Sequence, residues 1–320
     1  MSGTVFILGA TGRFGRAATQ AFSRAGWTVR AASRTGGGVH GVAVQGVTCD
    51  AYDKSALIAA VQGADVIVNA VHPLYFEWEE KQPILTRNVI AAGLASGATV
   101  MIPANVYPFG ETTPEVLREG NAPIPSTRKG AVRVTMERAF EDAAQDGLRT
   151  ILLRGGDYIE REITGNWFDS HITNKAHKGV FTYPGPMDCV HAWAYLPDMA
   201  RAMADLAAIR ADLSAFTALG FEGYSLTGAE LKAAVALTVG QRLKVKKIPW
   251  WALRLMAVFS PVMYELMEMR YLWTTPHRVD GDALRAVLPD FEPTPLAEAM
   301  KDAVYQGGPR PQVSQQARTA

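Results

Sequence analysis

A glycine-rich turn near the N-terminus joins a short apolar strand to a helical segment, in the sequence VFILGATGRFGRAAT (residues 5–19). Gly9, Gly12 and Gly15 follow the apolar run at intervals of three residues. Glycines at such positions permit a tight turn, let a diphosphate approach the backbone, and let a helix pack closely on a strand. The amides at the start of the helix then point at the anion, and the helix dipole adds to the attraction. The turn therefore predicts a βα unit that binds a dinucleotide.

Strand and helix signals alternate after this turn as far as residue 155. Alternation at this spacing is typical of a doubly wound parallel sheet, whose ligand crevice lies beyond the carboxyl ends of the strands. We therefore predict an α/β fold with a Rossmann-type, NAD(P)-binding domain over residues 1–155. Strands are expected over 4–8, 27–33, within 42–48, and over 65–71, 98–103 and 149–154, and helices over 13–25, 54–61, 75–95 and 129–145.

The alternation stops after residue 155, where glycine, proline and aromatic residues crowd the sequence up to residue 195. We interpret 155–195 as loops with a short helix, and we expect 196–216 to return to the first domain. Residues 156–195 and 217–305 are expected to form a smaller α+β substrate-binding region, and 306–320 a flexible polar tail. In the second half the pattern predicts helices over 196–209 and 229–239, a strand over 243–248 and an aromatic helix from residue 250.

The charge balance and the most apolar segment exclude two classes of partner. The 32 Lys and Arg residues balance 31 Asp and Glu residues, so no global field favours nucleic acid. The apolar stretch 250–269 contains Arg254, Glu265 and Glu268, so it is not expected to span a membrane. It is instead a core helix, a flap over an apolar pocket, or a dimer contact. The N-terminal segment has no charged region before its first strand. We therefore expect a cytoplasmic location. The protein is also expected to be a monomer or homodimer that acts on a small molecule.

The end of the second expected strand favours NADP(H) over NAD(H). An NAD site usually has an acidic residue there for the ribose 2′-hydroxyl, whereas this chain has Ser33 and Arg34. A guanidinium binds phosphate in a planar, bidentate manner, which suits a 2′-phosphate. Arg13, inside the glycine turn, is placed to reach the same group. A solvated surface arginine is the alternative interpretation of Arg34, and it leaves NAD(H) open.

Several segments together resemble the short-chain dehydrogenase/reductase superfamily in its extended or atypical branches. These segments are GATGRFG (9–15), VTCDAYD (47–53), NAVHP (69–73), NVYPFG (105–110), LLRGGDY (152–158) and YLPDMARAM (195–203). The resemblance implies that Asp50 lies near the adenine, although a carboxylate there is equally suited to cap the next helix. It also implies that Ala70 and Val71 line the nicotinamide half. The resulting candidate cofactor residues are Gly9, Thr11, Gly12, Arg13, Phe14, Gly15, Ser33, Arg34, Asp50, Ala70, Val71 and Asn105.

The catalytic residues of the extended branch are absent at the matching positions. Its Ser, Tyr and Lys fall on Pro103, Lys129 and Arg133. Atypical members similar to isoflavone reductases instead carry K-x-x-x-R-x-x-x-E, which is matched here by Lys129, Arg133 and Glu137 on one helix face. That resemblance implies that Lys129 donates a proton as hydride arrives, with Arg133 as its electrostatic neighbour. A solvated basic face paired with Glu137 is the alternative.

Other polar residues follow the expected strands. Tyr107 either orients the substrate or packs as a tyrosine at the edge of the site. Asn105 either holds the nicotinamide or turns the chain. His72 is a candidate proton relay, and Asp157 and Tyr158 follow the sixth expected strand, where the superfamily contacts its ligands. The six histidines have no ligand spacing, so no metal is expected.

These observations favour an NADPH-dependent reductase of the atypical type, acting on a small, apolar or planar carbonyl or enone. Lys129 would be its proton donor and Tyr107 its orienting donor. A sugar-nucleotide epimerase or dehydratase that retains NAD is one alternative. A non-catalytic NAD(P)-binding sensor or regulator is the other, because all three extended-branch catalytic residue types are missing.

Overall fold

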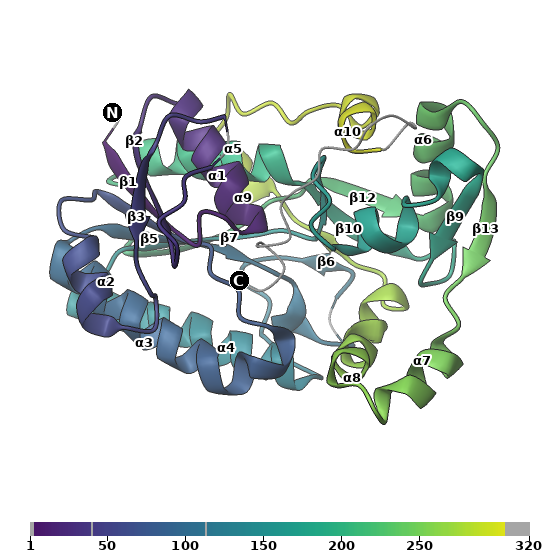
Figure 1. The fold of residues 1–320 in the computed structure, drawn as a ribbon, viewed down its shortest axis with the longest axis horizontal. Helices are drawn as coiled ribbons and strands as arrows, with labels where there is room; N and C mark the ends of the chain where they lie inside the picture. Colours follow the sequence, from purple (N-terminus) through teal and green to yellow (C-terminus); the bar gives the residue numbers. More distant parts are fainter. Residues whose placement is uncertain (1–2, 40, 113, 305–320) are drawn as a thin grey trace.

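The first strand, β1 (Thr4–Leu8), is buried at every position from Val5 to Leu8. A strand that is apolar on both faces needs helices on both sides of its sheet, which is the arrangement of doubly wound α/β folds. The computed structural model, which describes residues 3–39, 41–112 and 114–304, shows this arrangement (Figure 1).

The central sheet has seven strands in the order β11-β7-β5-β4-β1-β2-β3, and all its neighbouring strands are parallel. The order reverses between β1 and β4, so the topological switch point lies there. The predicted doubly wound sheet is confirmed. The other strands of the sheet are β2 (Thr28–Ser33), β3 (Gln45–Thr48), β4 (Val66–Asn69), β5 (Thr99–Ala104), β7 (Thr150–Arg154) and β11 (Phe216–Gly220).

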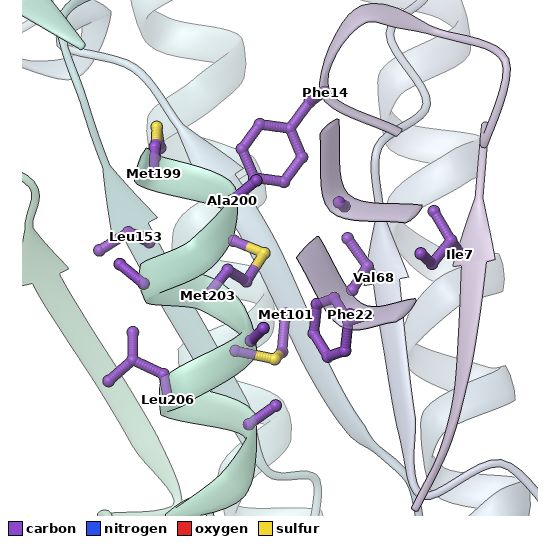
Figure 2. Close-up of a cluster of buried hydrophobic side chains, with 14 of the residues drawn as sticks. Ile7, Phe14, Phe22, Val68, Met101, Leu153, Met199, Ala200, Met203 and Leu206 are labelled. Carbon is purple, nitrogen blue, oxygen red and sulfur yellow. The ribbon is translucent and has the colours of Figure 1, made fainter. Parts of the chain in front are cut away.

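Two layers of helices cover the sheet. One face of the sheet is covered by α1 (Arg13–Arg24) and α5 (Leu196–Ala208). Phe14 of α1 and Met203 of α5 belong to the same buried cluster as alternate residues of the strands, among them Ile7 and Val68 (Figure 2). The opposite face packs against α2, α3 and α4. These helices span Lys54–Ala60, Trp78–Ser96 and Arg128–Asp142, and lie together below the sheet in Figure 1. The alternation of side chains along each strand thus divides the core into two clusters.

The prediction that 155–195 consists of loops with a short helix is wrong. The segment contains three strands, β8 (Asp157–Ile159), β9 (Val180–Tyr183) and β10 (Val190–Tyr195). The five residues after Val190 in β10 are all buried, so the strand has no alternating pattern by which to recognise it. β10 lies between β8 and β12 (Tyr224–Thr227) in a three-stranded sheet. The remaining pairs are β9 with β13 (Lys244–Lys247), and β6 (Val116–Leu117) with β14 (Arg278–Val279).

The aromatic segment after residue 250 forms two helices rather than one. α7 (Trp250–Ala257) ends before Ser260, whose Oγ accepts a hydrogen bond from the Met263 amide at 3.4 Å and caps α8 (Pro261–Glu268). No residue of α7 is buried, so the core-helix interpretation is wrong for α7. The other helices are α6 (Gly228–Val239), α9 (Asp282–Val287) and α10 (Leu296–Ala303), with single turns at Tyr75–Glu77, Tyr107–Phe109, Ala143–Asp146, Phe168–Ile172, Ala176–Lys178 and Met269–Trp273.

None of the helices in the described part of the chain is long and apolar enough to cross a membrane. The expected tail over 306–320 lies outside the described residues.

Candidate functional site

The glycine turn lies at the switch point of the sheet, against the loop that follows β4. Gly9 has a φ of +78°, which favours glycine, and a Cβ there would lie 3.0 Å from the Val71 amide nitrogen. A Cβ on Gly15 would overlap the Gly9 carbonyl oxygen, so this glycine allows α1 to pack against the turn. Gly12 is different, because its backbone is extended and a Cβ there would meet only the carbonyl oxygens of Gly9 at 3.1 Å and Ala70 at 3.8 Å.

The first turn of α1 offers backbone amides and contains no acidic residue of its own. Gly12 is its N-cap, has no capping side chain, and is followed by a first turn without acidic residues. At the ends of β2 and β4, Ser33 Oγ and Asn69 Oδ1 are buried and have no hydrogen-bond partner among the described residues. Bare backbone, a helix N-terminus and buried polar atoms without partners fit a dinucleotide with its diphosphate at the turn.

Two further residues of the turn have defined places. Thr11 is partly buried, and its carbonyl accepts a hydrogen bond of 2.6 Å from Arg16 Nη1. Phe14 is buried, with its ring 6.5 Å from that of Tyr158. The buried ring of Phe14 is packed against the protein, so the contribution of this residue to a ligand would come from its backbone amide.

At the far end of the crevice, Arg34 and Asp50 are both exposed. Asp50 Oδ1 accepts a hydrogen bond from the Tyr52 amide at 2.9 Å. The cap of α2 is Asp53, whose Oδ1 accepts from the Ala56 amide at 3.0 Å. The alternative in which Asp50 caps the next helix is therefore wrong.

Arg13 is held against the segment that follows β8. Its Nε lies 3.0 Å from Glu160 Oε1 and donates a hydrogen bond of 2.6 Å to Thr164 Oγ1. The Glu160 side chain is 2% exposed. Burial raises the pKa of Glu160 to about 7, while the charge of Arg13 and hydrogen bonds from Thr164 and Asn166 to the Glu160 carboxyl act in the opposite direction. Arg13 is therefore already paired with a carboxyl group that titrates near neutral pH.

His72 lies beyond β4 at the carboxyl edge of the sheet. The residue retains some solvent-exposed surface, and its ring packs on Trp78 at 4.9 Å and on Tyr75 at 5.3 Å. Enclosure by the surrounding protein, followed by the positive charges of Arg133 and Arg13, lowers the pKa of His72 to about 3. His72 is therefore a neutral imidazole at physiological pH, able to donate or accept a hydrogen bond.

Tyr107 is buried beyond β5, and its hydroxyl lies 3.0 Å from that of Tyr75. Burial, and then the neighbouring Tyr75 and Asp157, raise the pKa of Tyr107 well above its usual range. The residue thus remains a phenol that can donate a hydrogen bond. Asn105 Oδ1 accepts from the Tyr107 amide at 3.1 Å, which is the chain-turning arrangement.

The predicted Lys-Arg-Glu face of α4 is buried rather than solvated, so the solvated-face alternative is wrong. Arg133 stacks over the Trp78 ring at 4.5 Å, and its Nε has no hydrogen-bond partner among the described residues. Burial lowers the pKa of this guanidinium. Glu137 pairs with Arg154, with one oxygen 2.6 Å from Nη2.

Lys129 is enclosed between two carboxylates of α8. Its Nζ contacts Glu265 and lies 2.5 Å from Glu268 Oε2, while its backbone amide donates to Glu268 Oε1 at 3.1 Å. The ammonium also lies 5.3 Å from the centre of the Tyr75 ring. The sequence analysis gave Arg133 as the electrostatic neighbour of Lys129, whereas the structure places two carboxylates against the ammonium.

The sequence analysis missed two clusters near these residues. Glu265 and Glu268, noted only as charges that exclude a membrane span, are the partners of Lys129. Carboxylates three residues apart in an otherwise apolar helix were a usable signal for a buried cation.

The second missed cluster is formed by Asp157 and His191. Asp157 Oδ2 lies 2.8 Å from His191 Nε2, and the imidazole stacks on Trp273 at 4.2 Å. His277 completes this group at 4.6 Å from the His191 ring. Because β10 was not recognised, nothing in the sequence placed these histidines beside Asp157. In the part of the chain that the structure describes, no three His, Cys, Asp or Glu side chains are arranged to hold a metal.

Comparison with known proteins agrees with the resemblance drawn from the motifs. Residues 1–117 match the NmrA-like family. No curated protein sequence matches the chain.

Known structures of sugar-nucleotide enzymes share the fold. UDP-N-acetylglucosamine 4-epimerase from Bacillus cereus superposes with a TM-score of 0.73 at 17% identity, over 94% of this chain and 98% of the other. MoeE5 in complex with UDP-glucose and NAD superposes with a TM-score of 0.75 at 16% identity, over 94% of this chain and 97% of the other. UDP-glucose 4-epimerase from Brucella ovis in complex with NAD superposes with a TM-score of 0.70 at 15% identity, over 95% of this chain and 97% of the other. The chain therefore shares the fold of these structures.

Proposed function

We propose that this chain binds an NAD(P) dinucleotide at the β1/β4 switch point and reduces a small carbonyl or enone substrate that is apolar or planar. The observation that carries the proposal is the open backbone at Gly12, next to the N-terminus of α1, whose first turn contains no acidic residue. Ser33 and Asn69, with buried polar atoms that lack partners, support it. The dinucleotide would supply the hydride, and the chain's own residues would hold the substrate and the proton.

NADP(H) is the proposed form of the dinucleotide. Arg34 stands just beyond β2, where a 2′-phosphate would lie, and this strand end carries no acidic residue. Arg13 is less suited to that phosphate because it is paired with Glu160. We expect Arg34→Ala to weaken NADP binding about tenfold or more, since hydrogen bonds between charged groups contribute roughly 1.5–3 kcal/mol. NAD binding should change little.

The proposed reaction uses Lys129, Tyr107 and Arg133. Glu265 and Glu268 hold the Lys129 side chain in place, and an ammonium group is a chemically competent proton donor. Lys129 Nζ lies 5.3 Å from the centre of the Tyr75 ring, and the Tyr75 hydroxyl lies 3.0 Å from that of Tyr107, so the three side chains are neighbours. Tyr107 Oη would donate a hydrogen bond to the substrate oxygen, and the buried guanidinium of Arg133 would stabilise negative charge that develops there.

A glycine variant tests the cofactor site. A valine at position 12 fits the extended backbone of Gly12, and its side chain would occupy the space proposed for the diphosphate. The matched control is Gly120→Val, because a Cβ at Gly120 meets nothing within 4 Å. Calorimetry with NADP and NAD should show binding for the wild type and the control but none for Gly12→Val. Absence of binding by the folded wild type would refute the proposal.

Turnover separates the proposed catalytic roles. Lys129→Arg retains a cation between the carboxylates, and Tyr107→Phe retains the buried ring. Both variants should bind NADP normally and lose NADPH oxidation on a panel of enones and aldehydes. Unchanged turnover would remove the substituted residue from the reaction. Dinucleotide binding without turnover on any substrate by the wild type would favour the sensor or regulator alternative.

A sugar-nucleotide epimerase or dehydratase is the second candidate, because structures of this class, one of them holding UDP-glucose and NAD, share the fold. Against it, Pro103, Lys129 and Arg133 replace the residues that the extended branch uses. Co-purification of tightly bound NAD together with conversion of a UDP-sugar would make this candidate the better one.

A further inference from the structure

The hairpin formed by α7 and the start of α8, residues 250–264, presents large apolar side chains to solvent. Trp251 is 73% exposed and lies one helical turn before the exposed Leu255 in α7, and Phe259, in the turn that follows α7, is 90% exposed. Val258 and Tyr264 are also exposed. We call these five residues the apolar ridge. A concentration of large apolar residues on one outer face marks an interaction site rather than an ordinary surface.

The opposite side of the hairpin is anchored to the body of the protein. Trp250 Nε1 donates a hydrogen bond of 2.7 Å to the Pro184 carbonyl, and its ring lies 6.1 Å from that of Trp167. In α8, Glu265 and Glu268 pair with Lys129 of α4. Because the inner side is fixed in this way, the apolar ridge is held outward.

Positive charge accompanies the apolar ridge. The segment 231–264 contains six Lys and Arg residues and no Asp or Glu. Lys244, Lys246 and Lys247 are exposed on β13, which runs directly into α7 along the same margin of the molecule in Figure 1. Within the described ranges, none of these three lysines forms an ion pair with a carboxylate, and the same holds for Arg254 of α7.

We propose that the apolar ridge and the β13 lysines together dock the protein on the surface of an anionic lipid bilayer. Exposed tryptophan and leucine on a short helix, with phenylalanine in the turn after it and lysines beside it, are the composition of segments that lie in the plane of a membrane interface. Lysines near such a surface are attracted by anionic headgroups. α7 has eight residues, which suits insertion at the interface and not a span.

A second copy of this chain fits the surface less well. In a two-fold contact through the ridge, the same patch of both copies would meet. Two cationic segments without carboxylates would then face each other, and like charges across an interface disfavour association. An anionic bilayer has the complementary charge. This inference is independent of the proposed function, because neither the ridge nor the lysines belong to the dinucleotide site.

Vesicle sedimentation tests the inference with the full chain. The protein should sediment with vesicles made of equal parts phosphatidylcholine and phosphatidylserine at low salt, and much less with phosphatidylcholine alone. The double variant Trp251→Ser/Phe259→Ser should weaken binding at least tenfold. The triple variant Lys244→Ser/Lys246→Ser/Lys247→Ser should weaken it by about fivefold for each lysine and reduce its salt dependence.

The matched control replaces an exposed leucine and an exposed cation elsewhere, Leu94→Ser and Arg24→Ser, and should sediment like the wild type. NADP binding should be the same in all variants, which separates this test from that of the proposed function. Failure of the wild type to sediment with anionic vesicles would overturn the inference. So would equal weakening by the control, or a dimer seen by light scattering that Trp251→Ser/Phe259→Ser dissociates while vesicle binding persists.

Discussion

Replacing Lys129 with methionine removes the cation from a buried charge cluster and retains most of the side-chain volume. The Lys129 side chain is 2% exposed, and those of Glu265 and Glu268 are 9% and 12% exposed. Without the ammonium, two carboxylates on one face of α8 would face each other and an apolar side chain. Removing one partner of a buried ion pair costs about 3–5 kcal/mol. Arg128 remains 3.3 Å from Glu265 and is half-exposed, so we expect a loss of about 3 kcal/mol.

The pH dependence of this loss has a definite sign. Burial opposes ionisation of Glu268, but hydrogen bonds and charge from Lys129, with Arg128, hold the pKa of this carboxyl below its usual value of 4.5. In the wild type, the stabilisation from Glu268 is therefore fully present above that value and is lost as the pH falls through the depressed pKa. In the variant, no ammonium offsets the burial of the two carboxylates. Their ionisation then costs stability at neutral pH, and this cost disappears as they become protonated.

Urea unfolding followed by tryptophan fluorescence measures the difference. The variant should be less stable by about 3 kcal/mol near pH 7, and the gap should shrink toward about pH 4. Adding Glu265→Gln and Glu268→Gln to Lys129→Met should recover most of the loss, because no unpaired charge then remains. A loss below about 1 kcal/mol, the value typical of surface pairs, would refute the reasoning. A loss independent of pH would refute it as well.

Three further predictions follow from local geometry. Gly15→Ala should destabilise the protein by about 1–3 kcal/mol because its Cβ overlaps the Gly9 carbonyl, whereas Gly12→Ala should be nearly neutral in urea unfolding. Glu160 has a pKa of about 7, so NADP affinity measured by calorimetry should rise as the pH falls from about 8 to about 6, when protonation frees Arg13 from its negative partner. Glu160→Gln should abolish that dependence, and a persistent slope would contradict this assignment. Thr227→Ala should cost about 1 kcal/mol in the same unfolding assay, because Thr227 Oγ1 caps α6 by accepting from the Glu230 amide, and Thr227→Ser should restore it.

Much of the first half of this fold is determined by neighbouring residues. The turn at Gly9, Gly12 and Gly15 requires glycine for reasons of backbone conformation and close approach, which act within a few residues. Strands such as β1 are apolar at successive positions because both of their faces are covered. These requirements leave a pattern in the sequence, so the α/β order and the position of the turn could be predicted from it.

Segments with a weaker local pattern were predicted less well. β10 is buried over nearly its whole length, and neither its length nor its periodicity distinguishes it from other apolar segments. The break between α7 and α8 depends on Ser260 and on the proline after it, and the outward direction of α7 depends on which side of the hairpin is anchored. The apolar composition of a segment does not determine whether its side chains face the core or the solvent.

The charged groups of the candidate site show what only the tertiary structure decided. Helical spacing placed Lys129, Arg133 and Glu137 on one face, but their partners come from other segments. Lys129 pairs with Glu265, 136 residues away, while Glu137 pairs with Arg154 at the end of β7. Electrostatic pairing depends on distance in space and on exclusion of water, and both are set when helices and strands pack. The sequence by itself therefore determined where the glycine turn forms, and packing decided which charges meet around it.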